Sequence, residues 1–288
     1  MKTSKRNLFL GLLFFAGCLS FSGVNAQFMG VKGNGNVVQQ ERQVGDFTGI
    51  QILGSTDVII RQGDRSILVV HADENLLENI ITKVKNGVLI VDTEGSIRNY
   101  SRMEVFVTMS RLDEISIQGS GDVETDGVIS GTDLSIIVNG SGDVDLNLDY
   151  KNLETEINGS GDVEVAGIQG DLTMQIRGSG DFKAKELRLN KCRLSIFGSG
   201  DVSLSGTAGT VFIEQAASGD INLHNLKTQD AEIDSSGSGD IIITVTGNLK
   251  AGLKGSGDLT YSGNPLSMDV SSLGSGSVYK RNFGHNEN

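Results

Sequence analysis

The sequence is poor in the residues that most often form cross-links, metal sites and catalytic centres. Its 288 residues include two cysteines, three histidines and no tryptophan. Cleavage after Ala26 would leave Cys192 as the only cysteine, so no disulfide could form within the remaining chain. His71, His224 and His285 stand far apart, and none has a metal-type or triad-type pattern beside it. These absences argue against a disulfide scaffold and against a histidine-based site, and we predict no catalytic residue and no cofactor.

Basic charge is also scarce. The formal net charge is −12, and removal of residues 1–26, which carry three basic and no acidic side chains, makes it −15. Nucleic acids and anionic lipid surfaces are bound by basic surfaces, so neither is an expected partner.

The first 26 residues have the pattern of a signal peptide. Basic residues precede a short apolar run, Leu8–Ala16, and small residues stand before Gln27. We therefore predict export to the periplasm or the cell surface. An alternative cleavage at Phe15-Ala16-Gly17-Cys18 resembles a lipobox and would make Cys18 a lipidated anchor in the outer membrane. Contact with a membrane is expected only in that second case.

A four-residue motif, Gly-Ser-Gly-Asp, dominates what is present. Nine copies start 18 to 21 residues apart, with Ala217 replacing the first glycine once and Ser277 replacing the aspartate in the last copy. The copies start at residues 119, 140, 159, 178, 198, 217, 237, 255 and 274. A period of this regularity is typical of a solenoid, in which each repeat buries its apolar face only against its neighbours.

The residues around each motif alternate between apolar and polar. Apolar residues stand six, four and two positions before the motif, as in Leu134, Ile136 and Val138, and four and six positions after it begins, as in Val144 and Leu146. A period of two indicates strands with one buried face. The sequence therefore predicts an all-β fold, a right-handed parallel β-solenoid, or β-helix, of about 19-residue coils with Gly-Ser-Gly-Asp turns.

The regular coils are expected over residues 119–280, preceded by irregular opening coils over 46–118 and an N-terminal arm over 27–45. A disordered tail is expected over 281–288. Within the opening coils we predict strands at 66–72, 88–92 and 103–109. Asp73 to Ile80 is predicted to form a single helical turn with Asp73 as its cap.

The third residue of the motif is glycine in every copy, which favours a structural explanation. We expect these glycines to adopt a positive φ that a Cβ atom would strain, and we expect the first position to be less constrained because Ala217 occupies it once. The predicted structural glycines are Gly121, Gly142, Gly161, Gly180, Gly200, Gly219, Gly239, Gly257 and Gly276.

Several stretches of the opening region resemble a known family. Asp46–Ile50 leads into Gly54-Ser55-Thr56-Asp57-Val58, then Gln62-Gly63-Asp64 and Gly87–Ile90, and the motif ladder follows. This order is similar to that of the putative autotransporter adhesin, head GIN domain family of exported proteins common in Bacteroidetes. The resemblance spans residues 46–265. It implies a β-helical fold and an adhesin-like role, and it implies no catalytic residues.

The aspartates of the motif form the most specific candidate site. Stacked coils would place them about 4.8 Å apart along one edge, where neighbouring carboxylates repel. Backbone hydrogen bonds within the turns are the favoured explanation of how this repulsion is offset, and a calcium ladder is the alternative. The residues are Asp122, Asp143, Asp162, Asp181, Asp201, Asp220, Asp240 and Asp258.

Cys192 occupies the position that leucine holds in four other coils, so we predict a buried core residue and not a nucleophile. A polysaccharide-acting enzyme is the natural catalytic alternative for a β-helix. Its site would need gathered basic residues and exposed aromatic rings, yet lysine and arginine are dispersed and only four tyrosines are present.

We therefore predict a non-enzymatic, exported interaction module that binds an envelope or surface protein or a glycan. The alternative from another class is a structural envelope-stress protein that self-associates through its coil ends as a homo-oligomer.

Overall fold

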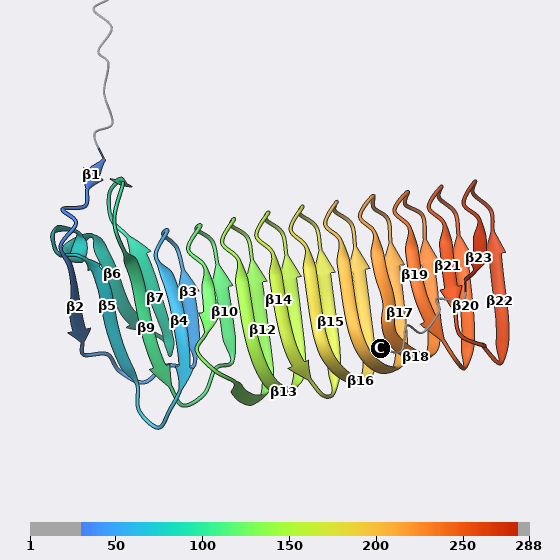
Figure 1. Cartoon of the computed structure of the whole chain (residues 1–288), viewed down its shortest axis with the longest axis horizontal. Helices are drawn as coiled ribbons and strands as arrows, with labels where there is room; N and C mark the ends of the chain where they lie inside the picture. Colours follow the sequence, from blue (N-terminus) through green and yellow to red (C-terminus); the bar gives the residue numbers. More distant parts are fainter. Residues whose placement is uncertain (1–29, 282–288) are drawn as a thin grey trace, which may run out of the picture.

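A computed structural model describes residues 30–281, which form stacked parallel coils of about one motif period each (Figure 1). The predicted fold class, a parallel β-solenoid, is confirmed. Strand partners are offset by one repeat, as in the pairs Val144 with Val163 and Leu153 with Leu172. Within the described residues, no helix is long and apolar enough to cross a bilayer.

Each coil contributes to two sheets that face each other across the core. The pre-turn sheet holds the strands that lead into the motif, and the post-turn sheet holds the strands that follow it. The pre-turn strands are β3 (Gly49–Ile52), β10 (Glu114–Ile117), β12 (Ile129–Val138), β15 (Asp171–Ile176), β20 (Asn248–Leu253) and β22 (Ser267–Ser272). The post-turn strands are β4 (Asp57–Gln62), β11 (Val123–Thr125), β14 (Val163–Ile168), β19 (Ile241–Val245), β21 (Leu259–Ser262) and β23 (Val278–Lys280).

Four long strands belong to both sheets. They begin in the post-turn sheet, bend at the second turn of the coil and end in the pre-turn sheet of the next coil, so the hydrogen-bonded ladder is continuous. These strands are β13 (Val144–Ile157), β16 (Phe182–Ile196), β17 (Val202–Gln215) and β18 (Ile221–Ser235).

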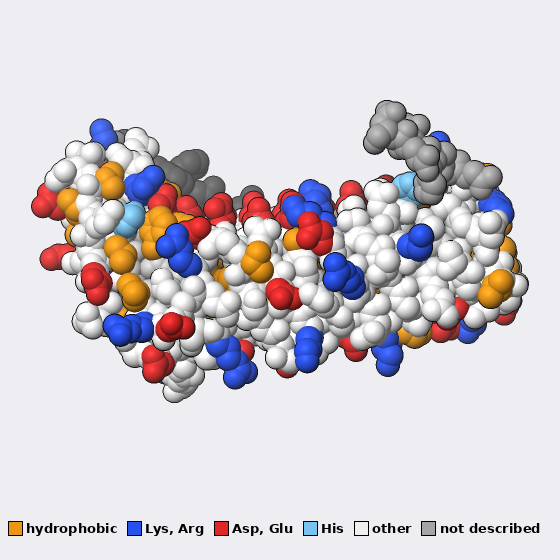
Figure 2. All heavy atoms as spheres, turned by 60° about the horizontal axis from the view of Figure 1, so that its bottom comes forward, with side chains coloured by type: hydrophobic (Ala, Val, Ile, Leu, Met, Phe, Trp, Pro, Cys, Tyr) orange, Lys and Arg blue, Asp and Glu red, His pale blue; other side chains and the backbone are white. Residues whose placement is uncertain are grey.

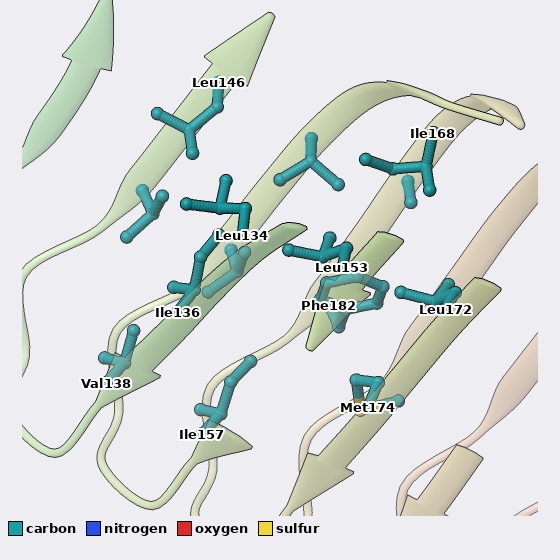
Figure 3. Packing of buried hydrophobic residues seen from close by; sticks show 14 of the residues in the cluster. Leu134, Ile136, Val138, Leu146, Leu153, Ile157, Ile168, Leu172, Met174 and Phe182 are labelled. Atoms are coloured by element: carbon teal, nitrogen blue, oxygen red, sulfur yellow. The ribbon is translucent and has the colours of Figure 1, made fainter. Parts of the chain in front are cut away.

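The core lies between the two sheets and follows the predicted alternation. In Figure 3, Leu134, Leu153 and Leu172 form one row along the stack, and Phe182 and Leu146 belong to the facing strands. Residues between them point to solvent, so that burial along β13 alternates almost without exception. Each coil thereby buries its apolar side chains against the coils before and after it.

The N-terminal cap closes one end of this core with antiparallel strands. It consists of β1 (Val31–Lys32), β2 (Val37–Arg42), β5 (Ile67–Asp73), η1 (Glu74–Asn79), β6 (Ile80–Lys85), β7 (Val88–Thr93), β8 (Ile97–Arg98) and β9 (Met103–Met109). Strands β9, β5 and β2 extend the post-turn sheet, and β7 and β6 extend the pre-turn sheet. The 3₁₀ helix η1 links β5 to β6 at the end of the core, and its Leu76 has no exposed surface.

The predicted helical turn is confirmed, with Asp73 at its N-cap position, but the expectation that the Asp73 side chain caps it is wrong. A 3₁₀ helix does follow, but the Asp73 side chain makes no capping hydrogen bond to it. The carboxylate is fully buried, and its Oδ2 accepts hydrogen bonds from the amides of Gly35 at 3.3 Å and Ser101 at 3.2 Å. Asp73 therefore ties two loops of the cap together, a role that depends on contacts distant in sequence.

The opposite end of the solenoid has no such cover among the described residues. Met268 and Val270 of β22 occupy core columns, yet Met268 is 44% exposed and Val270 is only partly buried. Leu266 and Leu273, which flank β22, are 87% and 82% exposed. We call β22, β23 and these two leucines the C-terminal end.

Candidate functional site

The aspartates of the motif lie along one edge of the solenoid, as the repeat predicts. Each carboxylate accepts, through Oδ1, a hydrogen bond from the backbone amide of the next aspartate, at 2.7–2.8 Å. The chain of bonds starts at Asp57, which accepts from Asp122 at 3.0 Å, and ends where Ser277 donates to Asp258. We call this row the aspartate ladder.

The ladder differs from the predicted turn capping in one respect. The carboxylates do accept backbone amides, but the donor belongs to the next coil and not to the same turn. Each bond is assisted by the negative charge, and this offsets part of the repulsion between neighbours. The ladder therefore joins consecutive coils along their edge.

Asp57 is the member that the sequence pattern did not assign to the ladder. It is half-buried, and burial raises the pKa of its carboxyl. The hydrogen bond from Asp122 acts in the opposite direction, and the negative charges of Asp122, Glu104 and Glu124 add to the rise. The sequence did contain a signal for this role, because the degenerate turn Gly54-Ser55-Thr56-Asp57 ends in aspartate, as the motif does.

Calcium binding to the ladder remains the alternative to the favoured hydrogen-bond explanation. Over residues 30–281, no group of three or more histidine, cysteine, aspartate and glutamate side chains is placed to hold a metal ion. Two neighbouring carboxylates would supply only part of the six to eight oxygen ligands that calcium takes.

The glycines of the motif are required by close stacking and not by backbone conformation. The expectation of a positive φ at the third position is wrong, since none of these glycines is among the positive-φ residues. A Cβ atom on Gly180 would lie 2.0 Å from the carbonyl oxygen of Gly161 and 3.1 Å from Cγ2 of the core residue Ile157. On Gly178 it would lie 1.9 Å from the carbonyl oxygen of Gly159.

The coil with Ala217 shows that a Cβ atom at the first motif position is accompanied by the loss of a hydrogen bond between coils. In the other coils the serine amide donates to the first residue of the preceding turn, as Ser199 does to Gly178 at 2.9 Å and Ser238 to Ala217 at 2.9 Å. Among the turns of the described chain, only Ser218 lacks this bond to its predecessor, Gly198. The methyl group is accommodated by the loss of one hydrogen bond between coils.

The remaining sequence candidates do not gather. Cys192 is fully buried, which confirms the core prediction, and burial raises the pKa of its thiol to about 12. His71 packs against Phe106 with ring centroids 4.4 Å apart, far along the chain from His224 on β18. Cys18 and His285 lie outside the described residues, as does the predicted signal peptide.

The outward side of the pre-turn sheet, here called the pre-turn face, carries features that the sequence did not single out. Three shallow hollows of about 360, 270 and 270 Å³ follow one another along it. The first is lined by Arg111, Asp133, Asn152, Glu154 and Asp171, and the last by Glu232, Asp234, Lys250 and Lys254.

The middle hollow contains an aromatic platform. The guanidinium of Arg193 lies 4.9 Å from the centre of the Phe212 ring, and Ser195 and Glu214 complete the wall. Phe197 directly precedes the motif of the same coil, two residues after Ser195, and it is 42% exposed. The signal for this platform was present, because Phe212 stands in an outward column where other coils have serine, threonine or charged residues.

Ion pairs between coils order the charged side chains of this face. Lys250 contacts Glu232 at 2.6 Å and Lys254 contacts Asp234 at 3.0 Å. The hydrogen bond with Glu232 raises the pKa of Lys250, and the charge of Glu232 adds to it. On another side of the solenoid, Figure 2 shows basic side chains interspersed with acidic ones and hydrophobic side chains gathered over the N-terminal cap. Such exposed pairs add little stability, so their main effect is to set a mixed charge pattern.

Comparison with known families gives one match. A family model described as "Putative auto-transporter adhesin, head GIN domain" matches residues 46–204 and 192–265. A comparison with curated proteins finds no match.

Solved structures share the fold. A crystal structure of a putative adhesin from Parabacteroides merdae has 24% identity and a TM-score of 0.65, and the match covers 88% of this chain and 99% of that one. A putative adhesin from Parabacteroides distasonis has 24% identity and a TM-score of 0.66, with 87% and 99% covered. A putative lipid binding protein from the same species has 26% identity and a TM-score of 0.65, with 88% and 99% covered.

Proposed function

Since the chain belongs to the family of the putative auto-transporter adhesin, head GIN domain, we propose that it is a non-enzymatic interaction module of the cell envelope. The protein is exported, and it binds a surface or envelope protein through the pre-turn face. The observation that carries this proposal is the middle hollow, where Arg193 and Phe212 form a platform on a rigid sheet.

The dimensions of the pre-turn face support a protein partner. Nine coils stacked about 4.8 Å apart span about 40 Å, and each side of a coil is about 17–20 Å wide. The face therefore covers about 700–800 Å², close to the roughly 800 Å² that each partner buries in a standard protein–protein interface.

The composition of the face supports the same partner class. Arginine and aromatic residues are enriched where protein interfaces bind most strongly, and Arg193 and Phe212 stand near the middle of this one. The alternating charges around them would select a partner with the complementary pattern. The hollows are open and mix polar with apolar lining, whereas small-molecule sites are enclosed and mostly apolar.

An array of envelope proteins and glycans tests this proposal with a pair of variants. Arg193→Ser combined with Phe212→Ser should abolish binding to a protein on the array. Lys183→Ser, an exposed residue on the post-turn sheet, is the control and should bind as the unmodified protein does. Binding to glycans alone, or equal loss in both variants, would contradict the assignment.

A further inference from the structure

At the C-terminal end, apolar side chains are exposed beside two strand edges that have no partner in the described residues. Met268, Val270 and Val278 continue the core columns of the coil before, but no coil follows them in the described residues. Strand β22 pairs only with β20, and β23 pairs only with β21, so the outer backbone groups of both strands lack a strand partner within residues 30–281. A strand added here would cover the core and satisfy the backbone at once.

The edge of β22 also lacks the protection that the pre-turn sheet has at the other end. The outermost strand of the pre-turn sheet in the cap, β6, exposes Lys83 and Lys85, which oppose the addition of another strand. Strand β22 carries one charge, Asp269, and is flanked by the exposed Leu266 and Leu273.

The distribution of charged side chains favours association of two copies through this end. Residues 119–247 carry eight basic and 21 acidic side chains, so two copies repel along most of the solenoid. Residues 248–281 carry four basic and two acidic side chains. Repulsion between two copies is therefore weaker when their C-terminal ends meet than when their central coils meet.

We propose that the C-terminal end binds the same end of a second copy, in a two-fold symmetric dimer formed by antiparallel pairing of β22. The two-fold axis is perpendicular to the sheets and runs midway between the two β22 strands at the level of Val270, so that Val270 lies opposite the partner's Val270. It sets Met268 opposite the partner's Ser272, and Asp269 opposite the partner's Ser271. The neighbouring register would place Asp269 against the partner's Asp269, where like charges directly opposite are destabilising.

A head-to-tail stack is disfavoured by the aspartate ladder. Every coil from Asp122 onward accepts the amide of the next turn through a carboxylate, but the last turn carries Ser277 in that place. A parallel continuation by another chain would lose this bond. Symmetric antiparallel pairing does not require it, and it closes the assembly at two copies.

The dimer has a consequence for binding. An axis perpendicular to the sheets keeps both pre-turn faces on the same side, so a dimer would present two copies of that face to one surface. Two linked sites bind a surface more strongly than one, without any new contact in either site. The dimer itself does not depend on which ligand the face takes.

Analytical ultracentrifugation of the purified protein tests the dimer. We expect a monomer–dimer equilibrium whose dissociation constant rises at least about tenfold in Leu266→Arg combined with Leu273→Arg, because the added charges oppose each other across the axis. Both leucines are already exposed, so the monomer should fold normally. Phe197→Arg is the matched control, because Phe197 occupies the same column as Leu273 in a central coil.

Cysteine cross-linking tests the geometry. In a Cys18→Ser background, Val270→Cys should give a dimer joined by a disulfide under mild oxidation, while the buried Cys192 stays unreacted. A protein that stays monomeric at all concentrations would overturn the proposal. So would an open-ended series of oligomers, or a dimer that Val270→Cys does not cross-link.

Discussion

The two ends of the solenoid differ in how far they shield the apolar core from solvent. At the N-terminal cap the chain reverses direction, adds antiparallel strands to both sheets and buries Leu76 of η1 with no exposed surface. At the C-terminal end the last coil repeats the pattern of its predecessors and stops, with Met268 of the core column 44% exposed.

The difference shows that a repeat can specify a stack without specifying where the stack closes. Each regular coil presents an apolar surface to the next coil, so a repeat alone always leaves one surface uncovered. Closure requires residues that depart from the repeat, as those of the cap do. The C-terminal end has few such residues in the described chain, and this is what makes it a candidate for association.

Thiol reactivity should give the largest contrast between the interior and the open end. Cys192 and Met268 occupy the same core column, and burial raises the pKa of Cys192 to about 12. In a Cys18→Ser background, Met268→Cys should react with a thiol reagent near pH 8 about a thousandfold faster than Cys192, because only the thiolate reacts. The rates are measured with native protein at low concentration, where no dimer forms, and unfolded protein serves as the reference. Equal native rates would show that the stack does not exclude solvent at Cys192.

The second largest contrast is expected in the stability that is lost when an apolar side chain is truncated at each end. Leu76→Ala should lower the free energy of unfolding by about 2–5 kcal/mol, because it opens a cavity under the cap. Leu273→Ala should change it by less than about 0.5 kcal/mol, because Leu273 is 82% exposed. Urea unfolding at low protein concentration, where no dimer forms, measures both. A loss of similar size in the two variants would mean that the C-terminal end is covered within one chain.

The turn glycines should show a smaller effect that depends on position in the stack. Gly180→Ala should cost about 2–3 kcal/mol, because the added methyl group meets both a backbone carbonyl and the core. Gly178→Ala should cost about 1 kcal/mol, the value of one hydrogen bond, because the first position lies at the surface and Ala217 is tolerated there.

Gly276→Ala in the last coil is the matched control for these glycine variants. Its Cβ atom would meet Gly257 in the same way, but only one neighbouring coil is present. We expect a smaller loss than for Gly180→Ala. A positive-φ requirement would instead make the two losses equal.

The aspartate ladder should give the smallest effect. Asp181→Asn should cost less than about 1 kcal/mol, since the amide oxygen can accept the bond from Asp201 and repulsion with neighbouring carboxylates falls. Asp181→Ala should cost about 1–2 kcal/mol, because the Asp201 amide loses its acceptor.

Calcium provides the counter-test for the ladder. If hydrogen bonds explain the ladder, millimolar Ca²⁺ should raise the melting temperature no more than NaCl of equal ionic strength. A saturable rise that is specific to Ca²⁺ and absent in Asp181→Asn would instead assign the ladder to metal binding.

Most of the regular region was predictable from the sequence because its determinants are local and repeated. The motif spacing set the coil length, and the alternation around Leu134, Ile136 and Val138 identified the buried face. The strands expected at 66–72, 88–92 and 103–109 are present within a residue or two at each end. The burial of Cys192 followed from its column in the repeat.

The errors arose where contacts join residues distant in sequence. Asp73 is a residue that favours helix caps, yet its carboxylate is used by the amides of Gly35 and Ser101. Glycine in every third motif position is compatible with either a positive φ or a close approach, and only the distance to the next coil distinguishes them. The outward column of Phe212 was visible in the sequence, but its contact with Arg193 joins two neighbouring coils and depends on how they stack.

The sequence by itself determined the repeat, the two strands of each coil and the side chains that face the core, because these depend on residues only a few positions apart. Tertiary structure decided how the coils touch. In the stack, the motif backbones of neighbouring coils lie so close that an added Cβ atom would clash. Each aspartate of the ladder accepts a hydrogen bond from the coil that follows. At the N-terminal cap, the chain reverses direction and closes the core. At the other end no further coil covers Met268 and Val270 within residues 30–281, and a parallel stack buries a coil only when another coil lies on each side.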